Sequence, residues 1–193
     1  MYKASDELAL FLNKRGLEMN KDLLKLLNDQ IAMEIHSANL YLNMSAFFED
    51  EGLDGMAHWL YVQHLEEMDH AMKIYHHIIE RGEHAEIGQI DQPERDFEGV
   101  FDVWSRALEH EKMISKAFDE IMALAMEQKE FKSLTMIQWF VDEQVEEEDT
   151  FGGIKDKLEF SECSKNVLMQ MNAQMATRAY NPLPGGMMPT VGE

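Results

Sequence analysis

The sequence predicts an all-α protein: an up-down-down-up four-helix bundle with one long crossover and a short fifth helix. Three observations predict this fold. Apolar residues recur at helical spacing through four long segments, and no segment alternates as a half-buried β-strand does. Glycine and proline separate the segments. One connection between the long segments is much longer than the other two, which favours a crossover that runs the length of the bundle.

Start and stop signals bound each element. Asn20 is the expected N-cap of the first long helix, because its side chain can accept hydrogen bonds from the first free backbone N–H groups. Gly52 and Gly82 are expected to end the first and second helices. In chain order, the long helices are expected at residues 21–49, 54–81, 97–128 and 131–158, and the short fifth helix at about residues 162–176.

The connections set the directions of the helices. The short links at residues 49–54 and 128–131 make the flanking helices antiparallel. Helices of about 28 residues are roughly 42 Å long, and residues 82–96 can span that length at about 3.3 Å per residue. Residues 1–20 then form an N-terminal extension, residues 21–176 a bundle domain with its fifth helix, and residues 177–193 a flexible C-terminal tail.

The composition is strongly acidic. Asp and Glu number 37 against 17 Lys and Arg, which gives a formal net charge of −20. Such a charge repels nucleic acid and anionic membranes and attracts cations. The single cysteine, Cys163, can form no internal disulfide. No apolar run resembles a signal peptide or approaches the roughly 20 residues of a membrane span. We therefore expect a cytoplasmic protein with no nucleic-acid or membrane partner.

Each predicted helix carries one glutamate on its apolar stripe, near the middle of the helix. Because the four positions lie at similar heights, the four carboxylates should meet at one level inside the bundle. The glutamates are Glu34, Glu67, Glu111 and Glu147. On the third helix, the expected stripe also contains Phe101, Trp104, Leu108, Ser115, Phe118 and Met122.

Four buried carboxylates need compensation. Each costs several kcal/mol without a partner, and no Lys or Arg lies on the stripes at that height. Either cations neutralise them or they are protonated. His70, three residues after Glu67 on the same face, adds an imidazole that favours iron or manganese, whereas oxygen ligands alone would suit calcium or magnesium. This Glu-x-x-His element is typical of di-iron carboxylate bundles.

Over residues 21–176, the chain resembles the bacterial non-haem ferritins, which belong to the ferritin-like di-iron superfamily. The similarity rests on Glu34 followed seven residues later by Tyr41, and on three further groups. These are Glu66-Glu67-Met68-Asp69-His70, His110-Glu111, and Gln138-Trp139-Phe140-Val141-Asp142-Glu143-Gln144 with Glu146-Glu147. The resemblance implies a ferritin-like fold and an iron-storage function.

The resemblance also implies roles for individual residues. Glu34, Glu67 and His70 would bind one iron, and Glu67 would bridge to a second iron held by Glu111 and Glu147, with Gln144 nearby. A third iron position would map onto Glu66, Glu143 and Glu146, with Glu147 shared. Tyr41 would be the redox-active aromatic residue beside the centre, and Trp139 a neighbouring one. The implied activity is a ferroxidase, which oxidises Fe(II) to Fe(III) with dioxygen and stores ferric mineral in a shell of 24 copies.

Alternatives remain at this point. A di-iron oxidase or oxygenase would act on a small organic substrate, and a helical interaction module would bind no metal. Haem-binding bacterioferritins have a second Glu-x-x-His on the fourth helix, whereas Thr150 stands three residues after Glu147 here. Met68 occupies the spacing of the bacterioferritin haem ligand, but non-haem relatives share it, so haem is not expected.

Overall fold

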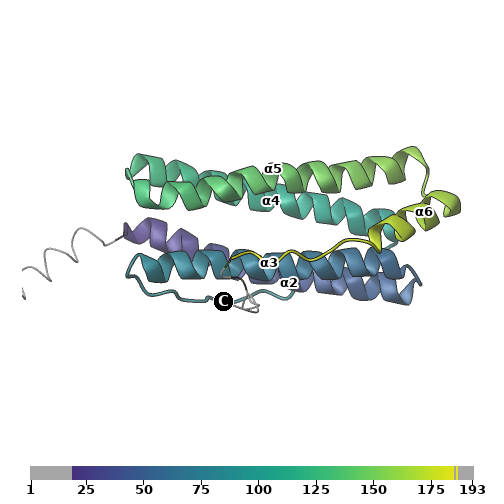
Figure 1. Cartoon of the computed structure of the whole chain (residues 1–193), viewed down its shortest axis with the longest axis horizontal. Helices are drawn as coiled ribbons and strands as arrows, with labels where there is room; N and C mark the ends of the chain where they lie inside the picture. Colours follow the sequence, from purple (N-terminus) through teal and green to yellow (C-terminus); the bar gives the residue numbers. More distant parts are fainter. Residues whose placement is uncertain (1–18, 185, 187–193) are drawn as a thin grey trace, which may run out of the picture.

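A computed structural model describes residues 19–184 and 186, and over them the chain forms helices and no strand. Figure 1 shows two antiparallel helix pairs packed side by side, with a short helix at one end of the bundle. None of the described helices is long and apolar enough to cross a membrane. The predicted all-α bundle is confirmed. Its helices are α2 (Lys21–Asp50), α3 (Asp54–Glu80), α4 (Val100–Glu127), α5 (Phe131–Phe160) and α6 (Lys165–Met175).

The helix ends follow the predicted chemistry at Asn20, Gly52 and Gly82, whereas the third long helix and the fifth helix each begin three residues later than expected. The Asn20 side chain accepts hydrogen bonds from the backbone N–H groups of Asp22 (2.8 Å) and Leu23 (3.2 Å), so it caps α2. Glycine at 52 and 82 adopts φ of +70° and +78°, which ends α2 and α3. The third long helix begins three residues later than expected from Phe97, because Gly99 has a φ of +152° that no α-helix contains.

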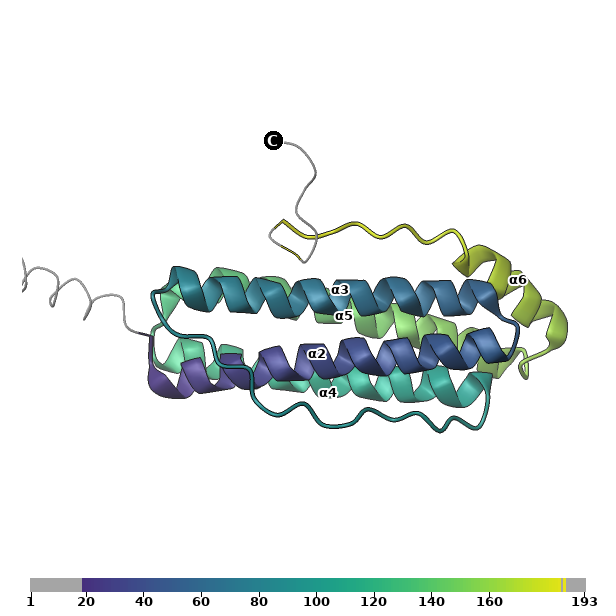
Figure 2. The same ribbon diagram turned by 90° about the horizontal axis from the view of Figure 1, so that it is seen from below.

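The connection between α3 and α4 runs along the bundle to its opposite end, as Figure 2 shows. Two asparagines of α2 hold it in place. The Asn43 side chain donates to the carbonyl oxygen of Glu94 (2.9 Å), and the Asn28 side chain accepts from the backbone N–H of Glu86 (2.9 Å). Because the chain returns to the far end before α4 starts, α3 and α4 run parallel, which is the predicted up-down-down-up order.

The apolar core consists of two clusters at opposite ends of the bundle. At the end near α6, Trp104 stacks on Phe48 and Phe151 meets the edge of Trp59, with ring centroids 5.8 and 5.2 Å apart. At the other end, Phe118 stacks on Phe140 at 4.4 Å. Polar side chains occupy the layer between the two clusters. The bundle interior is therefore apolar, then polar, then apolar along its length.

The predicted stripe of the third helix is partly wrong. Phe101 is 37% exposed, and Leu108, Ser115 and Met122 are only partly buried. The prediction followed bulky side chains, whereas the face of α4 that meets the other helices includes small residues that allow close approach. This buried face carries Val103, Trp104, Ala107, His110, Glu111, Ile114, Phe118, Ile121 and Ala125. The stripe that helical spacing predicts for α5 is buried throughout; it carries Ile137, Phe140, Gln144, Glu147, Phe151, Ile154 and Leu158.

Helix α6 docks against the start of α3. The Asn172 side chain accepts a hydrogen bond from the backbone N–H of Met56 (2.9 Å). Only glycine fits at position 55, because a Cβ atom there would lie 1.8 Å from the carbonyl oxygen of Asn172. Met171 and Met175 complete the apolar cluster at this end. The chain therefore leaves α6 beside α3, where residues 177–184 continue.

Candidate metal centre

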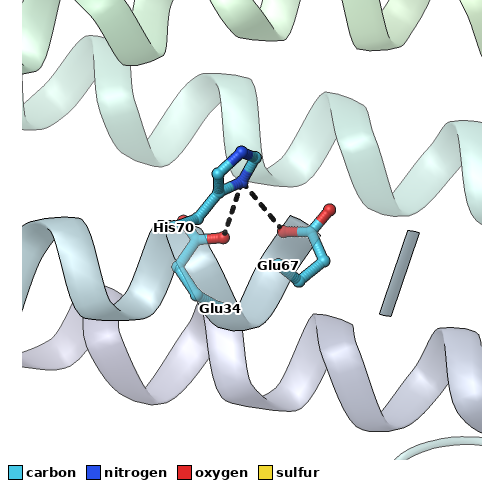
Figure 3. A group of neighbouring side chains, drawn as sticks. All are labelled: Glu34, Glu67 and His70. Carbon is cyan, nitrogen blue, oxygen red and sulfur yellow. Dashed lines mark hydrogen bonds and ion pairs between the residues drawn. The ribbon is translucent and has the colours of Figure 1, made fainter. Parts of the chain in front are cut away.

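Helices α2 and α3 place three buried side chains around one point. His70 Nδ1 lies 3.3 Å from Glu67 Oε2 and 3.9 Å from Glu34 Oε2. One potential ligand atom from each residue lies within 4.8 Å of the others, and no residue of the three is more than 3% exposed. Figure 3 shows both carboxylates directed toward the imidazole. This is the only such group of three or more among the residues that the structure describes.

The charges in this group are unevenly compensated: Glu67 contacts both His70 and Gln63 and its pKa is lowered, whereas Glu34 is less well partnered. Glu34 Oε1 accepts from Gln30 Nε2 (2.7 Å), but Glu34 Oε2 is buried without a hydrogen-bond partner. Burial and the neighbouring charge of Glu67 raise the pKa of Glu34 well above its usual value. Burial opposes the charge of His70, yet the carboxylates of Glu67 and Glu34 raise its pKa to about 10. The two carboxylates thus favour the protonated form of His70 when no metal ion is bound.

The remaining carboxylates of the polar layer come from α4 and α5 and are better satisfied. Tyr41 donates to Glu111 Oε1, and Gln144 Nε2 donates to Glu111 Oε2 at 2.9 Å. Gln63 Nε2 donates to Glu147 Oε1 at 3.0 Å. Burial, together with the charge of Glu67, still raises the pKa of both glutamates, to about 7 for Glu147. Glu147 can therefore exchange a proton for a cation near neutral pH.

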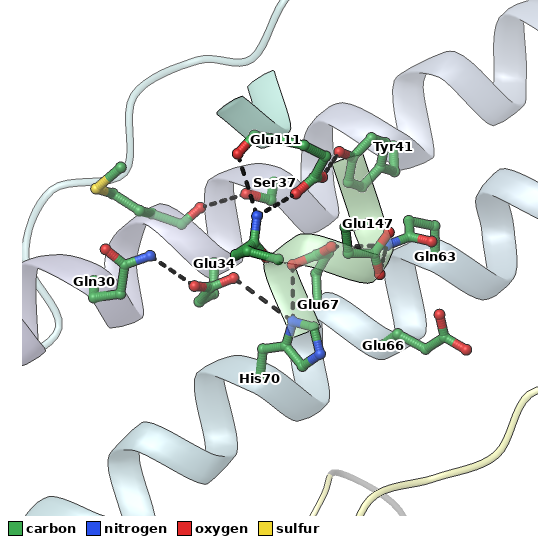
Figure 4. A network of polar contacts seen from close by, with 12 residues as sticks. Gln30, Glu34, Ser37, Tyr41, Gln63, Glu66, Glu67, His70, Glu111 and Glu147 are labelled. Carbon is green, nitrogen blue, oxygen red and sulfur yellow. Dashed lines mark hydrogen bonds and ion pairs between the residues drawn. The ribbon is translucent and has the colours of Figure 1, made fainter. Parts of the chain in front are cut away.

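Gln63 joins the two halves of the layer and was not singled out as a site residue from the sequence. Its Nε2 atom lies 3.0 Å from Glu67 Oε1 and 3.0 Å from Glu147 Oε1. Figure 4 shows Gln63 beside Glu147 in the polar layer. The available signal was position: Gln63 lies four residues before Glu67 on the same predicted stripe. All five predicted ligands of the iron pair, together with Gln144 and Tyr41, thus lie buried in one polar layer.

The three glutamates predicted for a third iron lie on the outer side of this layer. Glu66, Glu143 and Glu146 line a pocket of about 300 Å³ that also contacts His70 and Glu147. Burial raises the pKa of Glu66 and of Glu143. Arg178, which the sequence did not indicate, lines the same pocket and forms an ion pair with Glu66. No sequence pattern indicates this contact, because the two residues are 112 positions apart and no periodicity relates them.

The two predicted aromatic residues flank the layer. Tyr41 is fully buried and stacks on Phe151 at 5.6 Å, and burial beside Glu111 raises its pKa, which keeps the phenol protonated. The ring centroids of Trp139 and His70 lie 5.5 Å apart. His110, which the sequence paired with Glu111 only through the resemblance, contacts the Ser37 hydroxyl at 2.7 Å through Nε2.

Comparison with known proteins decides the family. The ferritin-like domain family matches residues 24–161. The chain belongs to the ferritin family. It is 38% identical to a bacterial non-heme ferritin of Campylobacter jejuni over 72% of this chain and 84% of the relative. It is 34% identical to one of Staphylococcus haemolyticus over 84% of this chain and 98% of the relative. The general function of this family is iron storage.

Solved structures give the same result for the fold. An engineered closed form of the Archaeoglobus fulgidus ferritin superposes with a TM-score of 0.82 at 32% identity, and the match covers 85% of this chain and 100% of that one. A humanized archaeal ferritin superposes with a TM-score of 0.83 at 34% identity, covering 86% and 100%. The predicted resemblance and the four-helix fold of this ferritin chain are therefore confirmed, whereas the role of each ligand stays a prediction.

Proposed function

We propose that this protein is a ferroxidase that oxidises Fe(II) to Fe(III) with dioxygen at a pair of iron sites inside each bundle. Glu34, Glu67 and His70 would hold one ferrous ion. Glu67 would bridge to a second ion held by Glu111 and Glu147. Iron is here the substrate and the stored cargo.

The observation that carries the proposal is the group of Glu34, Glu67 and His70. A buried carboxylate oxygen without a hydrogen-bond partner is costly, and Glu34 Oε2 is such an atom. In the described part of the chain, the only cationic group in ion-pair contact with this carboxylate is His70, which can lose its proton and become a ligand. A metal ion would therefore give the unpartnered Glu34 oxygen a ligand bond, and it would replace the proton of His70 as the source of positive charge.

The chemistry follows from the donor set. Carboxylate oxygens with one imidazole suit iron and stabilise the ferric state, which favours oxidation over simple binding. Two ferrous ions held in one network can each give one electron to the same dioxygen molecule, which takes up two electrons and two protons to form hydrogen peroxide. Glu34, Glu111 and Glu147 have raised pKa values, so each can carry a proton that it releases when a metal ion binds to its carboxylate.

Storage completes the proposal. We infer that copies of this chain assemble into a closed shell of 24 subunits and that ferric product accumulates inside it. Sequence and structural similarity to ferritins over most of the chain supports this assembly. The net charge of −20 per chain supports the attraction of ferrous ions to it. The third iron position at Glu66, Glu143 and Glu146 and a cytoplasmic location are further parts of this proposal.

The test is to remove two predicted ligands and measure iron oxidation. Glu67→Ala and His70→Ala should each abolish the fast phase of absorbance change when Fe(II) meets dioxygen in a stopped-flow instrument. Both variants should elute with the same particle mass as the wild type. His76→Ala, an exposed histidine on the same helix, is the matched control and should keep the fast phase. Unchanged kinetics in either ligand variant would refute the assignment.

A further inference from the structure

The chain beyond α6 returns along the outside of α3. Residues 177–184, named here the latch segment, run back from the end of the bundle toward its middle (Figures 1 and 2). They reach the level of the candidate metal centre, because Asn181 and Leu183 line the outer acidic pocket together with Glu66 and Glu143. The segment therefore covers the side of the bundle on which the third iron position was predicted.

Arg178 of the latch segment brings a positive charge into this acidic pocket. Its guanidinium forms an ion pair with Glu66 Oε2 and donates a hydrogen bond to the carbonyl oxygen of Trp59 (3.2 Å). The guanidinium carbon also lies 3.9 Å from the centroid of the Trp59 ring, which is a favourable cation–π arrangement. Two of the three contacts are to Trp59, so the guanidinium keeps a binding place even when Glu66 is taken by another cation.

A buried carboxylate anchors the other end of the latch segment. Asp69 is fully buried, and its Oδ2 atom accepts hydrogen bonds from the Tyr180 hydroxyl (2.7 Å) and the backbone N–H of Leu183 (2.9 Å). Gly186 approaches so closely that a Cβ atom there would lie 2.2 Å from Asp69 Oδ1. Asp69 lies between Glu67 and His70 in the sequence, so the latch is fastened to the turn of α3 that carries two predicted ligands.

We propose that Arg178 is the resting occupant of the outer acidic pocket and that a divalent cation must displace its guanidinium from Glu66 to bind there. This inference rests on the proposed function, because it adds a competitor at the predicted third position. The guanidinium and a metal ion are both positive and would share one carboxylate, so each weakens the binding of the other at Glu66. The latch segment then keeps the affinity of the outer pocket low, so that an ion held by Glu66, Glu143 and Glu146 is easily released.

The experiment is an anaerobic calorimetric titration of the full-length protein with Zn(II), a redox-inert probe. The binding step lost in Glu66→Gln defines the outer pocket, and the step lost in His70→Ala defines the inner site. Arg178→Gln should tighten the outer step about fivefold, as expected for removal of one part-buried ion pair, and leave the inner step unchanged. Arg178→Lys keeps the charge and should retain most of the competition.

Two further variants separate competition from a structural effect. Tyr180→Phe removes one anchor of the latch segment and should tighten the outer step about twofold. Arg106→Gln removes an arginine of α4 that pairs with Asp102 of the same helix and with Glu94 of the connection before it, and it should change neither step. A crystal structure of Arg178→Gln with Zn(II) at Glu66 would support the proposal directly.

The outcomes are distinct. The proposed role of the latch segment would be overturned if Arg178→Gln bound Zn(II) in the outer pocket no more tightly than the wild type. It would also be overturned if Glu66→Gln lost no binding step. Neither result would contradict the inner site. If His70→Ala kept every Zn(II)-binding step, the proposed function would be contradicted, independently of the result for the outer pocket.

Discussion

The two halves of the polar layer differ in how well their charges are satisfied. Helices α2 and α3 contribute two carboxylates and an imidazole, and they leave Glu34 Oε2 without a hydrogen-bond partner. Helices α4 and α5 contribute Glu111 and Glu147, which accept hydrogen bonds from Tyr41, Gln144 and Gln63. Burial raises the pKa of glutamates in both halves, but only the first half leaves a buried carboxylate oxygen without a hydrogen-bond partner. Metal should therefore bind the first half more tightly.

The largest expected effect concerns the first metal equivalent. His70→Ala should weaken binding of the first Fe(II) in an anaerobic titration by more than the roughly 10–100-fold typical of losing a partner of a ligand, because a ligand itself is lost. Glu111→Ala should keep the first equivalent and lose the second. If Glu111→Ala lost the first equivalent instead, the ranking of the two halves would be wrong.

A smaller effect concerns stability without metal. A carboxyl group whose folded pKa is raised stabilises the fold below its unfolded pKa, and this contribution is lost as the pH rises through the folded pKa. Burial raises the pKa of Glu34, so the metal-free protein should be less stable at pH 8 than at pH 5. Glu34→Gln should recover about 2 kcal/mol at pH 8, the cost of one poorly partnered buried group.

The measurement is chemical unfolding of chelator-treated protein at the two pH values. Glu49→Gln, an exposed glutamate on the same helix, is the control and should leave the difference between pH 5 and pH 8 unchanged. Added metal should reverse the order of stability, because only the wild type keeps Glu34 as a ligand. A Glu34→Gln protein that gained nothing at pH 8 would show that the site is not strained.

The smallest expected effect concerns the link between the halves. Gln63→Ala removes the amide that contacts both Glu67 and Glu147, and it should weaken the second metal equivalent about tenfold while changing the first less. Gln138→Ala, in which an exposed glutamine loses its contact with Asp142, is the control. Equal weakening of both equivalents would mean that Gln63 supports the layer as a whole and does not join its halves.

Local patterns predicted most of this molecule. Asn20, Gly52 and Gly82 ended or capped helices as expected, since caps and turns depend on a few adjacent residues. The glutamates of the four helices fell in one layer because helical spacing places a mid-helix residue at a known height. Phe101 was wrongly assigned to the buried stripe of α4. Side-chain size does not identify the buried face where small residues such as Ala107 are buried between helices.

Contacts between distant parts of the chain were beyond prediction. Arg178 reaches Glu66, and Tyr180 reaches Asp69, across more than 100 residues without any repeating pattern. Ser37 and His110 likewise meet across 73 residues. Such pairs depend on the exact angle at which α6 leaves the bundle and on how closely α4 approaches α2, and no local signal sets either quantity.

The two apolar clusters close the polar layer at both ends of the bundle axis. Phe48, Trp104 and Phe151 close one end, and Phe118 with Phe140 closes the other. An ion moving along the axis through these apolar clusters would lose its hydration shell and gain no polar contact in return, which is strongly unfavourable. Under the proposed function, ions would therefore enter and leave the centre transversely, between neighbouring helices, and the gap they use would select which ions pass.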